Sequence, residues 1–344
     1  MRYFHNDYNQ MCHQVILQKL QGISGEAMSG YGTDIYCKKA EERVRNLCKN
    51  QSLSVHFLVG GTQTNLTVIA AALRPHQAAV CAISGHINVH ETGAVEATGH
   101  KVIGLPTTDG KITAQQVEQV AQNHFLDGDR EHIAQPKLVY ISNSTEYGTV
   151  YTLEELESLS RVCKKYGYYL FLDGARLGYA LAAAGNDVTL ADLARVCDVF
   201  YIGMTKCGAM FGEAVVITNP AIDEDFRYIM KQRGGMLAKG WLIGAQFEAL
   251  FEDELYFQIA GQANQYADVL QQALVEKGYA LYMPCSTNQV FPVMPVEVLP
   301  ELEKHITFMP MEFVDDTHRV IRLCTSWATT REDMDYLCEI IRKL

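Results

Sequence analysis

Three short segments of the chain carry groups that could serve one reaction. Gly60, Gly61 and Thr62 stand between a strand-like and a helix-like run, and the free backbone N–H groups that open such a helix bind anions such as phosphate. Asp173 ends an apolar run, where a carboxylate could hold a protonated ring nitrogen. Lys206 follows 33 residues later, at the end of another apolar run, and a lysine that loses water there has a lowered pKa and can form a Schiff base.

Each segment also has an ordinary structural interpretation. The glycines suit a tight turn in which Thr62 caps the helix. Asp173 could form an Asx turn or an ion pair with Arg176, although a guanidinium there could equally grip a substrate carboxylate with two parallel bonds. Lys206 could extend its apolar stem to solvent. Together, however, a phosphate corner, an acid for a ring nitrogen and a reactive amine match the needs of pyridoxal 5′-phosphate (PLP).

Alternating strand-like and helix-like runs must position these residues. The runs predict α/β architecture with a mostly parallel, covered sheet, and in such sheets ligands bind beyond the carboxyl ends of the strands. The last of these strands follows its neighbour too closely for a helical crossover, so we expect it to be antiparallel. From about residue 280, the order of runs predicts a smaller α+β domain. The predicted strands of the large sheet are 54–59, 78–83, 101–106, 137–142, 168–172, 198–203 and 213–218.

Composition narrows the class of protein. The chain has 344 residues, 48% of them hydrophobic, and a net charge of −11, which argues against nucleic acid or anionic membrane partners. Ten cysteines without a C-x-x-C pair indicate reduced thiols and a cytoplasmic protein. The N-terminus is too polar for a signal peptide, and the glycines form neither G-x-G-x-x-G nor a P-loop, which argues against a nicotinamide-dependent oxidoreductase.

Six stretches of the chain resemble one family in order and content: YGTD, GGTQTN, SGHINVHETGA, LFLDGARL, GMTKCG and IRLCTSWATT. From about residue 5 to the C-terminus, the chain is similar to the threonine aldolase/β-eliminating lyase family, and most similar to its phenylserine-aldolase-like branch. The resemblance implies PLP fold type I, the aspartate aminotransferase fold, with a seven-stranded-type sheet. It also implies a large domain over 23–250 and a small α+β domain over 1–22 and 251–344. Its members are often homodimers or homotetramers with shared active sites.

The resemblance also assigns roles to residues. Arg176 and Arg322 would bind the substrate carboxylate, with Asn6 where the family often has serine. Lys239 would contact the phosphate of a neighbouring subunit's cofactor, because many members have an arginine where this chain has Leu237. The residues implied for binding the chain's own cofactor are Lys206 as the covalent anchor, Asp173 at the pyridine nitrogen, Gly61 and Thr62 at the phosphate, His86 stacked on the ring, and Thr205 and Arg176 beside it. Tyr31, in a glycine-rich loop, is a candidate for reaching a neighbouring site.

The catalytic base is open at this stage. Many family members have a histidine after the strand at 137–142, whereas this chain has Ser142-Asn-Ser-Thr-Glu146. His86, His90, Glu146 or a water that they hold are the candidates. The i, i+4 spacing of the two histidines is not H-E-x-x-H, and we expect no metal. The favoured activity is cleavage of small β-hydroxy-α-amino acids to glycine and an aldehyde. Alternatives are β-elimination to ammonia and a 2-oxo acid, or PLP binding without catalysis.

Overall fold

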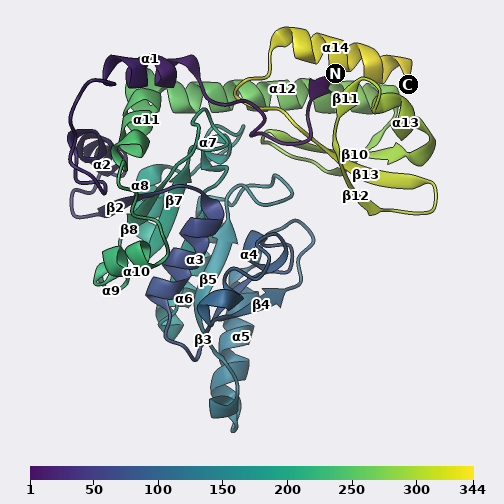
Figure 1. Ribbon diagram of the computed structural model, residues 1–344. Helices are drawn as coiled ribbons and strands as arrows, with labels where there is room; N and C mark the ends of the chain where they lie inside the picture. The colour runs from purple at the N-terminus through teal and green to yellow at the C-terminus, as the bar shows by residue number, and fades with distance from the viewer.

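The computed structural model describes residues 1–344 and is built around a seven-stranded sheet (Figure 1). The strand order is β2-β8-β7-β6-β5-β3-β4, in which β8 pairs antiparallel with both neighbours and the other pairs are parallel. Both the mostly parallel sheet and its antiparallel member were predicted and are confirmed. The strands are β2 (Ser54–Leu58), β3 (Gln77–Ala82), β4 (Lys101–Leu105), β5 (Gln135–Ser142), β6 (Tyr169–Asp173), β7 (Val199–Gly203) and β8 (Glu213–Ile217).

Helices cover both faces of this sheet because its central strands are apolar on both faces. Side chains alternate between the faces: Leu170 and Leu172 join a cluster of 45 buried residues, whereas Phe171 joins a cluster of 18 on the opposite side. The larger cluster receives α2 (Ile35–Leu47), α5 (Ala114–Leu126), α6 (Leu153–Tyr166), α8 (Leu190–Val196) and α11 (Trp241–Phe251), and the smaller one receives α3 (Gly61–Ala72) and α10 (Phe226–Gln232).

The C-terminal part forms a second, antiparallel sheet of order β12-β13-β10-β9. It is made of β9 (Ala280–Met283), β10 (Gln289–Pro295), β12 (Met309–Phe313) and β13 (His318–Cys324), and packs with α14 (Arg331–Lys343) and α12 (Leu255–Lys277) around a third apolar cluster. Figure 1 shows the long helix α12 running from above the large sheet to this smaller part. A smaller α+β unit here was predicted from the order of strand-like and helix-like runs after about residue 280.

The N-terminal segment returns to this smaller part. Strand β1 (Arg2–Tyr3) pairs in parallel with β11 (Ile306–Thr307), so β11 and β12, which are neighbours in the sequence, belong to different sheets. Phe4 then packs into the third cluster, and the following residues lie near the carboxyl edge of the large sheet. The domain limits at 22/23 and 250/251 stay a prediction.

The remaining helices are short connectors or surface elements: α1 (Gln14–Gly22), α4 (His86–Val89), α7 (Leu177–Leu181), α9 (Pro220–Asp223) and α13 (Leu299–Leu302). None of the helices has both the length and the apolar character that crossing a membrane demands. All ten cysteines are free thiols.

Candidate active site

The carboxyl edge of the large sheet collects the predicted groups. Asp173 is the last residue of β6, Lys206 follows β7, α3 begins after β2, and His86 opens α4 after β3. The charges that act on Lys206 come from Arg176, Asp7, Asp173 and Glu213. The structure therefore brings the predicted amine and the predicted ring-nitrogen acid to one edge of the sheet, as the topology requires.

Lys206 has an unpartnered amine. Its Nζ makes no hydrogen bond or ion pair with the protein, while the Tyr179 hydroxyl donates to its backbone carbonyl at 2.6 Å and fixes the main chain. The side chain is half-buried in densely packed surroundings, and burial, followed by the charge of Arg176, lowers the pKa of Lys206. The amine is thus more readily neutral and nucleophilic than a surface lysine, which disfavours the alternative of a lysine extended to solvent.

Asp173 is held as a buried carboxylate. It accepts hydrogen bonds from Asn65 Nδ2 at 3.0 Å, from the Tyr140 hydroxyl and from the Ala175 N–H at 2.9 Å. Burial alone would raise its pKa, but the charge of His86 and the Tyr140 hydrogen bond outweigh it, so the pKa of Asp173 is lowered. The Ala175 contact is the Asx turn considered from sequence, whereas the ion pair with Arg176 is wrong.

A buried network connects this carboxylate to His86. Asn65 Nδ2 also donates to Glu91 Oε1 at 2.8 Å, and His86 Nδ1 lies 2.9 Å from the same oxygen. Because a carboxylate accepts, Nδ1 carries the proton and the ring orientation is fixed. Sequence reasoning missed Asn65 and this role of Glu91. One available signal was that Asn65 lies four residues after Gly61, on the same face of α3.

The start of α3 has the backbone of an anion site. Gly60 caps the helix in an extended conformation and supplies no side-chain hydrogen bond, so the predicted Thr62 cap is wrong. Gly61 and Thr62 occupy the first turn, whose N–H groups have no intrahelical acceptors. A Cβ at Gly61 would lie 3.1 Å from the Tyr201 hydroxyl, which explains the glycine by close approach.

Arg176 is oriented by a partner that the sequence did not reveal. Its Nε and Nη2 donate to the two oxygens of Asp7 at 2.8 and 3.0 Å, and Asn288 Nδ2 also donates to Asp7 at 2.9 Å. Burial alone would raise the pKa of Asp7, but the charges of Arg176 and Lys206 and these hydrogen bonds lower it to about 2. The bidentate contact leaves Nη1 of Arg176 without a protein partner and available to a substrate anion.

Replacing Asp7 by alanine is expected to destabilise the fold by about 3–5 kcal/mol, because it leaves the buried Arg176 charge uncompensated. Asp7 is fully buried, and Arg176 is 10% exposed. Urea unfolding measured by circular dichroism checks this. The exposed pair of Arg331 and Asp335 offers the control: Asp335→Ala is expected to leave the midpoint unchanged. Equal midpoints for the two variants would contradict the prediction.

The other predicted carboxylate ligands are tied to the N-terminal segment. Arg322 Nη2 donates to the His5 carbonyl at 3.3 Å, and its Nε has no partner. Asn6 is buried, and its Oδ1 accepts the Tyr8 N–H at 3.0 Å. Because the charges of Arg322, Arg176 and Lys206 all act on the buried thiol of Cys324, the two arginines flank the same region as the amine.

Two candidate bases lie beside His86. Glu146 Oε1 accepts hydrogen bonds from the Ser142 hydroxyl at 2.8 Å and the His86 N–H at 2.9 Å, and burial raises the pKa of Glu146. The ring centroid of His90 is 5.6 Å from that of His86, and burial, then His86, lower the pKa of His90. No group of three or more His, Cys, Asp or Glu side chains is arranged to hold a metal ion.

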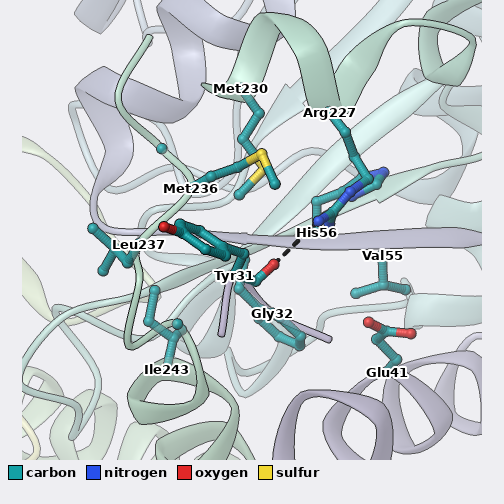
Figure 2. A pocket seen from close by; sticks show the side chains of 13 residues that line it. Tyr31, Gly32, Glu41, Val55, His56, Arg227, Met230, Met236, Leu237 and Ile243 are labelled. Carbon is teal, nitrogen blue, oxygen red and sulfur yellow. Dashed lines mark hydrogen bonds between the residues drawn. The ribbon is translucent and has the colours of Figure 1, made fainter. Parts of the chain in front are cut away.

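Tyr31 and Lys239 lie on two loops that contact each other. The Tyr31 N–H donates to the Leu237 carbonyl at 3.1 Å, and Arg227 Nη2 donates to the Tyr31 carbonyl at 3.1 Å (Figure 2). Lys239 is exposed two residues beyond Leu237. No hydrogen bond joins Tyr31 or Lys239 to Lys206 or Asp173, and the Lys239 amine has no hydrogen-bond or ion-pair partner within the chain.

Similar proteins were found by sequence and by structure. Residues 12–296 match the family described as Beta-eliminating lyase. The chain is 31% identical to the low specificity L-threonine aldolase of a Pseudomonas species, covering 76% of this chain and 75% of that protein. It is similar to the threonine aldolase of Leishmania major, with a TM-score of 0.97, 44% identity and coverage of 100% and 99%. A mutant aspartate aminotransferase of Thermus thermophilus shares the fold, with a TM-score of 0.69, 17% identity and coverage of 99% and 91%.

Proposed function

The chain belongs to the beta-eliminating lyase family, and from that premise we propose that it cleaves small β-hydroxy-α-amino acids, such as threonine, to glycine and an aldehyde. Two of the similar proteins named above are threonine aldolases. The single observation that carries the proposal within the site is the unpartnered amine of Lys206, on whose pKa the charge of Asp173 acts. Phenylserine and allo-threonine are proposed as further substrates.

The residues present fit PLP. Lys206 would anchor its aldehyde, ionised Asp173 would hold the protonated ring nitrogen, and the first turn of α3 would bind the phosphate. The aldehyde, the protonated ring nitrogen and the phosphate of PLP are thus each matched by a protein group of suitable chemistry. When bound, PLP supplies a ring that takes up the electron pair released by a breaking bond at Cα.

The two arginines orient the substrate. Arg176 offers its free Nη1 edge and Arg322 its partly unsatisfied guanidinium to the substrate carboxylate, and hydrogen bonds to charged groups contribute about 1.5–3 kcal/mol each. Asp7 keeps Arg176 in place throughout, because both of its oxygens are engaged by that side chain. Fixing the carboxylate selects which bond at Cα is aligned for cleavage, so positioning itself accelerates the reaction.

We assign removal of the β-hydroxyl proton to Glu146. Its carboxylate lies at the carboxyl edge of β5, tied to the His86 backbone, and its raised pKa brings it closer to the range in which a carboxylate is an effective base. Glu146→Gln is expected to lower kcat on the order of 100-fold and to remove the acidic limb of the pH–rate profile. His90→Gln is the matched comparison. A larger loss in His90→Gln than in Glu146→Gln would transfer the role to His90.

Product analysis tests the proposed function. Purified protein with PLP is incubated with L-threonine, L-allo-threonine, D-threonine and phenylserine, and glycine plus aldehyde are measured beside ammonia plus 2-oxo acid. Glycine and acetaldehyde from threonine are the expected products. Ammonia and a 2-oxo acid would instead establish β-elimination, and a coloured protein that turns over none of the four would establish a PLP-binding protein without catalysis.

We also propose that Lys239 and Tyr31 complete the site of a neighbouring subunit. The exposure of both side chains leaves them available to a neighbouring subunit, which supports this arrangement. Alone, Lys206→Ala is expected to be inactive and Lys239→Ala to be weakened. When the two variants are mixed in equal amounts and refolded, half of the dimers are mixed, and each mixed dimer has one intact site out of two. The mixture should therefore regain about a quarter of the wild-type number of intact sites. Mixed dimers without recovered activity would overturn the proposal. Size-exclusion chromatography gives the oligomeric state.

A further inference from the structure

Glu213 is a buried acid that the roles above leave unexplained. It opens β8, pairs across the sheet with Gly203 on β7 and Leu58 on β2, and is 2% exposed. Its Oε1 lies 2.8 Å from Thr205 Oγ1, whereas its Oε2 has no hydrogen-bond partner. A buried carboxylate with one unsatisfied oxygen is costly unless it is neutral. Burial raises the pKa of Glu213 to about 8, although the contact with Thr205 and the charge of Lys206 oppose the shift.

The protons at Thr205 Oγ1 can be counted. The Gly212 N–H donates to this oxygen at 3.1 Å, so one lone pair is used, and the hydroxyl has one proton of its own. If Glu213 is ionised, its carboxylate can only accept, so the Thr205 hydroxyl donates its proton to Glu213. If Glu213 is protonated, it can donate to the second lone pair of Thr205, and the hydroxyl proton of Thr205 is then free for another acceptor.

Thr205 lies beside the predicted phosphate corner. The same Gly212 N–H also donates to the Val59 carbonyl at 3.0 Å, and Val59 directly precedes the glycines that open α3. The Gly212 N–H therefore contacts both the Thr205 hydroxyl and the residue that directly precedes the first turn of α3, so the hydroxyl lies close to the amides of that turn. An anion bound there needs donors, and a hydroxyl turned toward Glu213 would present only lone pairs to it.

We infer that Glu213 is a positioning residue: it stays protonated and donates to Thr205, so that Thr205 donates its own proton to the phosphate of the cofactor. No proton is transferred; two hydrogen bonds point in one direction, from Glu213 through Thr205 to the anion. The inference rests on the proposed use of PLP, because it needs a phosphate at this corner. It assigns Glu213 no contact with substrate.

The arrangement makes phosphate binding depend on pH. Ionisation of Glu213 reverses the Thr205 hydroxyl and places a second negative charge behind the phosphate, so affinity falls above about pH 8. The other groups whose charge couples to Glu213 are Lys206, Asp173, Tyr201 and Tyr256. Of these, Lys206 also titrates toward neutrality in alkali, and therefore the test must separate the phosphate from the aldehyde.

Two ligands make that separation: PLP, and pyridoxal, which has the same ring and aldehyde but no phosphate. Their dissociation constants are measured by equilibrium dialysis between pH 6 and 9 for wild type, Glu213→Gln, Glu213→Ala and Thr205→Val. We expect Thr205→Val to bind PLP about tenfold more weakly at pH 7, with pyridoxal unchanged. Glu213→Ala removes the group that fixes the Thr205 hydroxyl but leaves the hydroxyl its own proton, so a smaller weakening of PLP binding is expected, again with pyridoxal unchanged. Glu213→Gln retains a donor without an ionisable proton, so it should bind PLP like wild type at pH 7 and lose the alkaline weakening.

The outcomes separate the role of Glu213 from the function on which it rests. Wild type that does not bind PLP defeats the proposed function. The role of Glu213 alone is overturned if wild type binds PLP and the PLP affinity of Glu213→Gln falls in alkali as much as that of wild type. That role is also overturned if the Glu213 variants weaken pyridoxal and PLP equally. Should Glu213→Ala not fold, the pH profile of Glu213→Gln still decides.

Discussion

Lys206→Ala is expected to lose the visible absorbance of the protein with PLP and to reduce threonine cleavage by at least about 10⁴-fold. The amine is the one group in the site that can join the aldehyde covalently, and removal of a residue that acts by forming such a bond costs up to about 10⁶ in rate. Its lack of any hydrogen-bond partner and the lowering of its pKa by burial leave it free for this role. Absorbance spectra and aldehyde release measure the two effects.

The control for this variant is another lysine of the same chain. Lys304 is exposed, paired with Glu301 and placed between α13 and β11, outside the large sheet, so Lys304→Ala should retain colour and turnover. Circular dichroism shows whether both variants fold. A folded Lys206→Ala protein that keeps both its colour and its turnover would refute the assignment of Lys206, and with it the proposed reaction.

Features that depend on local sequence were predicted well. The chain is a PLP-dependent lyase of the predicted family and fold type. The predicted strands 198–203 and 213–218 correspond to β7 and β8 within a residue, because short apolar runs bounded by polar residues have few other solutions. Lys206 and Asp173 could be placed at the same edge because parallel strands end together.

Contacts between distant segments could not be predicted. Asp7 and Arg176 are 169 residues apart, and nothing in the local pattern around Asp7 indicates that it will be buried against a guanidinium. The bridge that Asn65 makes between Glu91 and Asp173 could not be predicted either, because it depends on how α3 lies against β6. Glu213 stands in a strand where a charged residue would ordinarily suggest an exposed edge, yet it is almost fully buried.

These partners share a function in the site. Three predicted residues that would touch the cofactor or substrate are held by residues that would touch neither: Arg176 by Asp7, His86 by Glu91, and Asp173 by Asn65 and Tyr140. Sequence motifs therefore predict the reactive groups, whereas the structure supplies the buried acids and amides that fix their orientation and charge.

Asp173→Asn is expected to reduce kcat on the order of 10³-fold, the second largest effect in the site. The amide has nearly the shape of the carboxylate but no charge, so it cannot keep a ring nitrogen protonated, and the electron-withdrawing capacity of the ring falls. Tyr140 and Asn65, which both donate to one oxygen of Asp173, must also share a weaker acceptor. Steady-state kinetics with threonine measure the loss, and Asp173→Glu, which retains the charge on a longer stem, should recover part of it.

The pH dependence of stability separates this electrostatic effect from a folding defect. Because the folded-state pKa of Asp173 is lowered, its ionisation stabilises the fold at neutral pH, and this contribution is lost in acid as the carboxylate takes up a proton. Protein without PLP that carries Asp173→Asn should therefore be less stable than wild type at pH 7, and the difference should shrink toward pH 3. A variant as active as wild type at pH 7 would show that the charge of Asp173 does not act on the reaction, and the ring nitrogen would then need another acid.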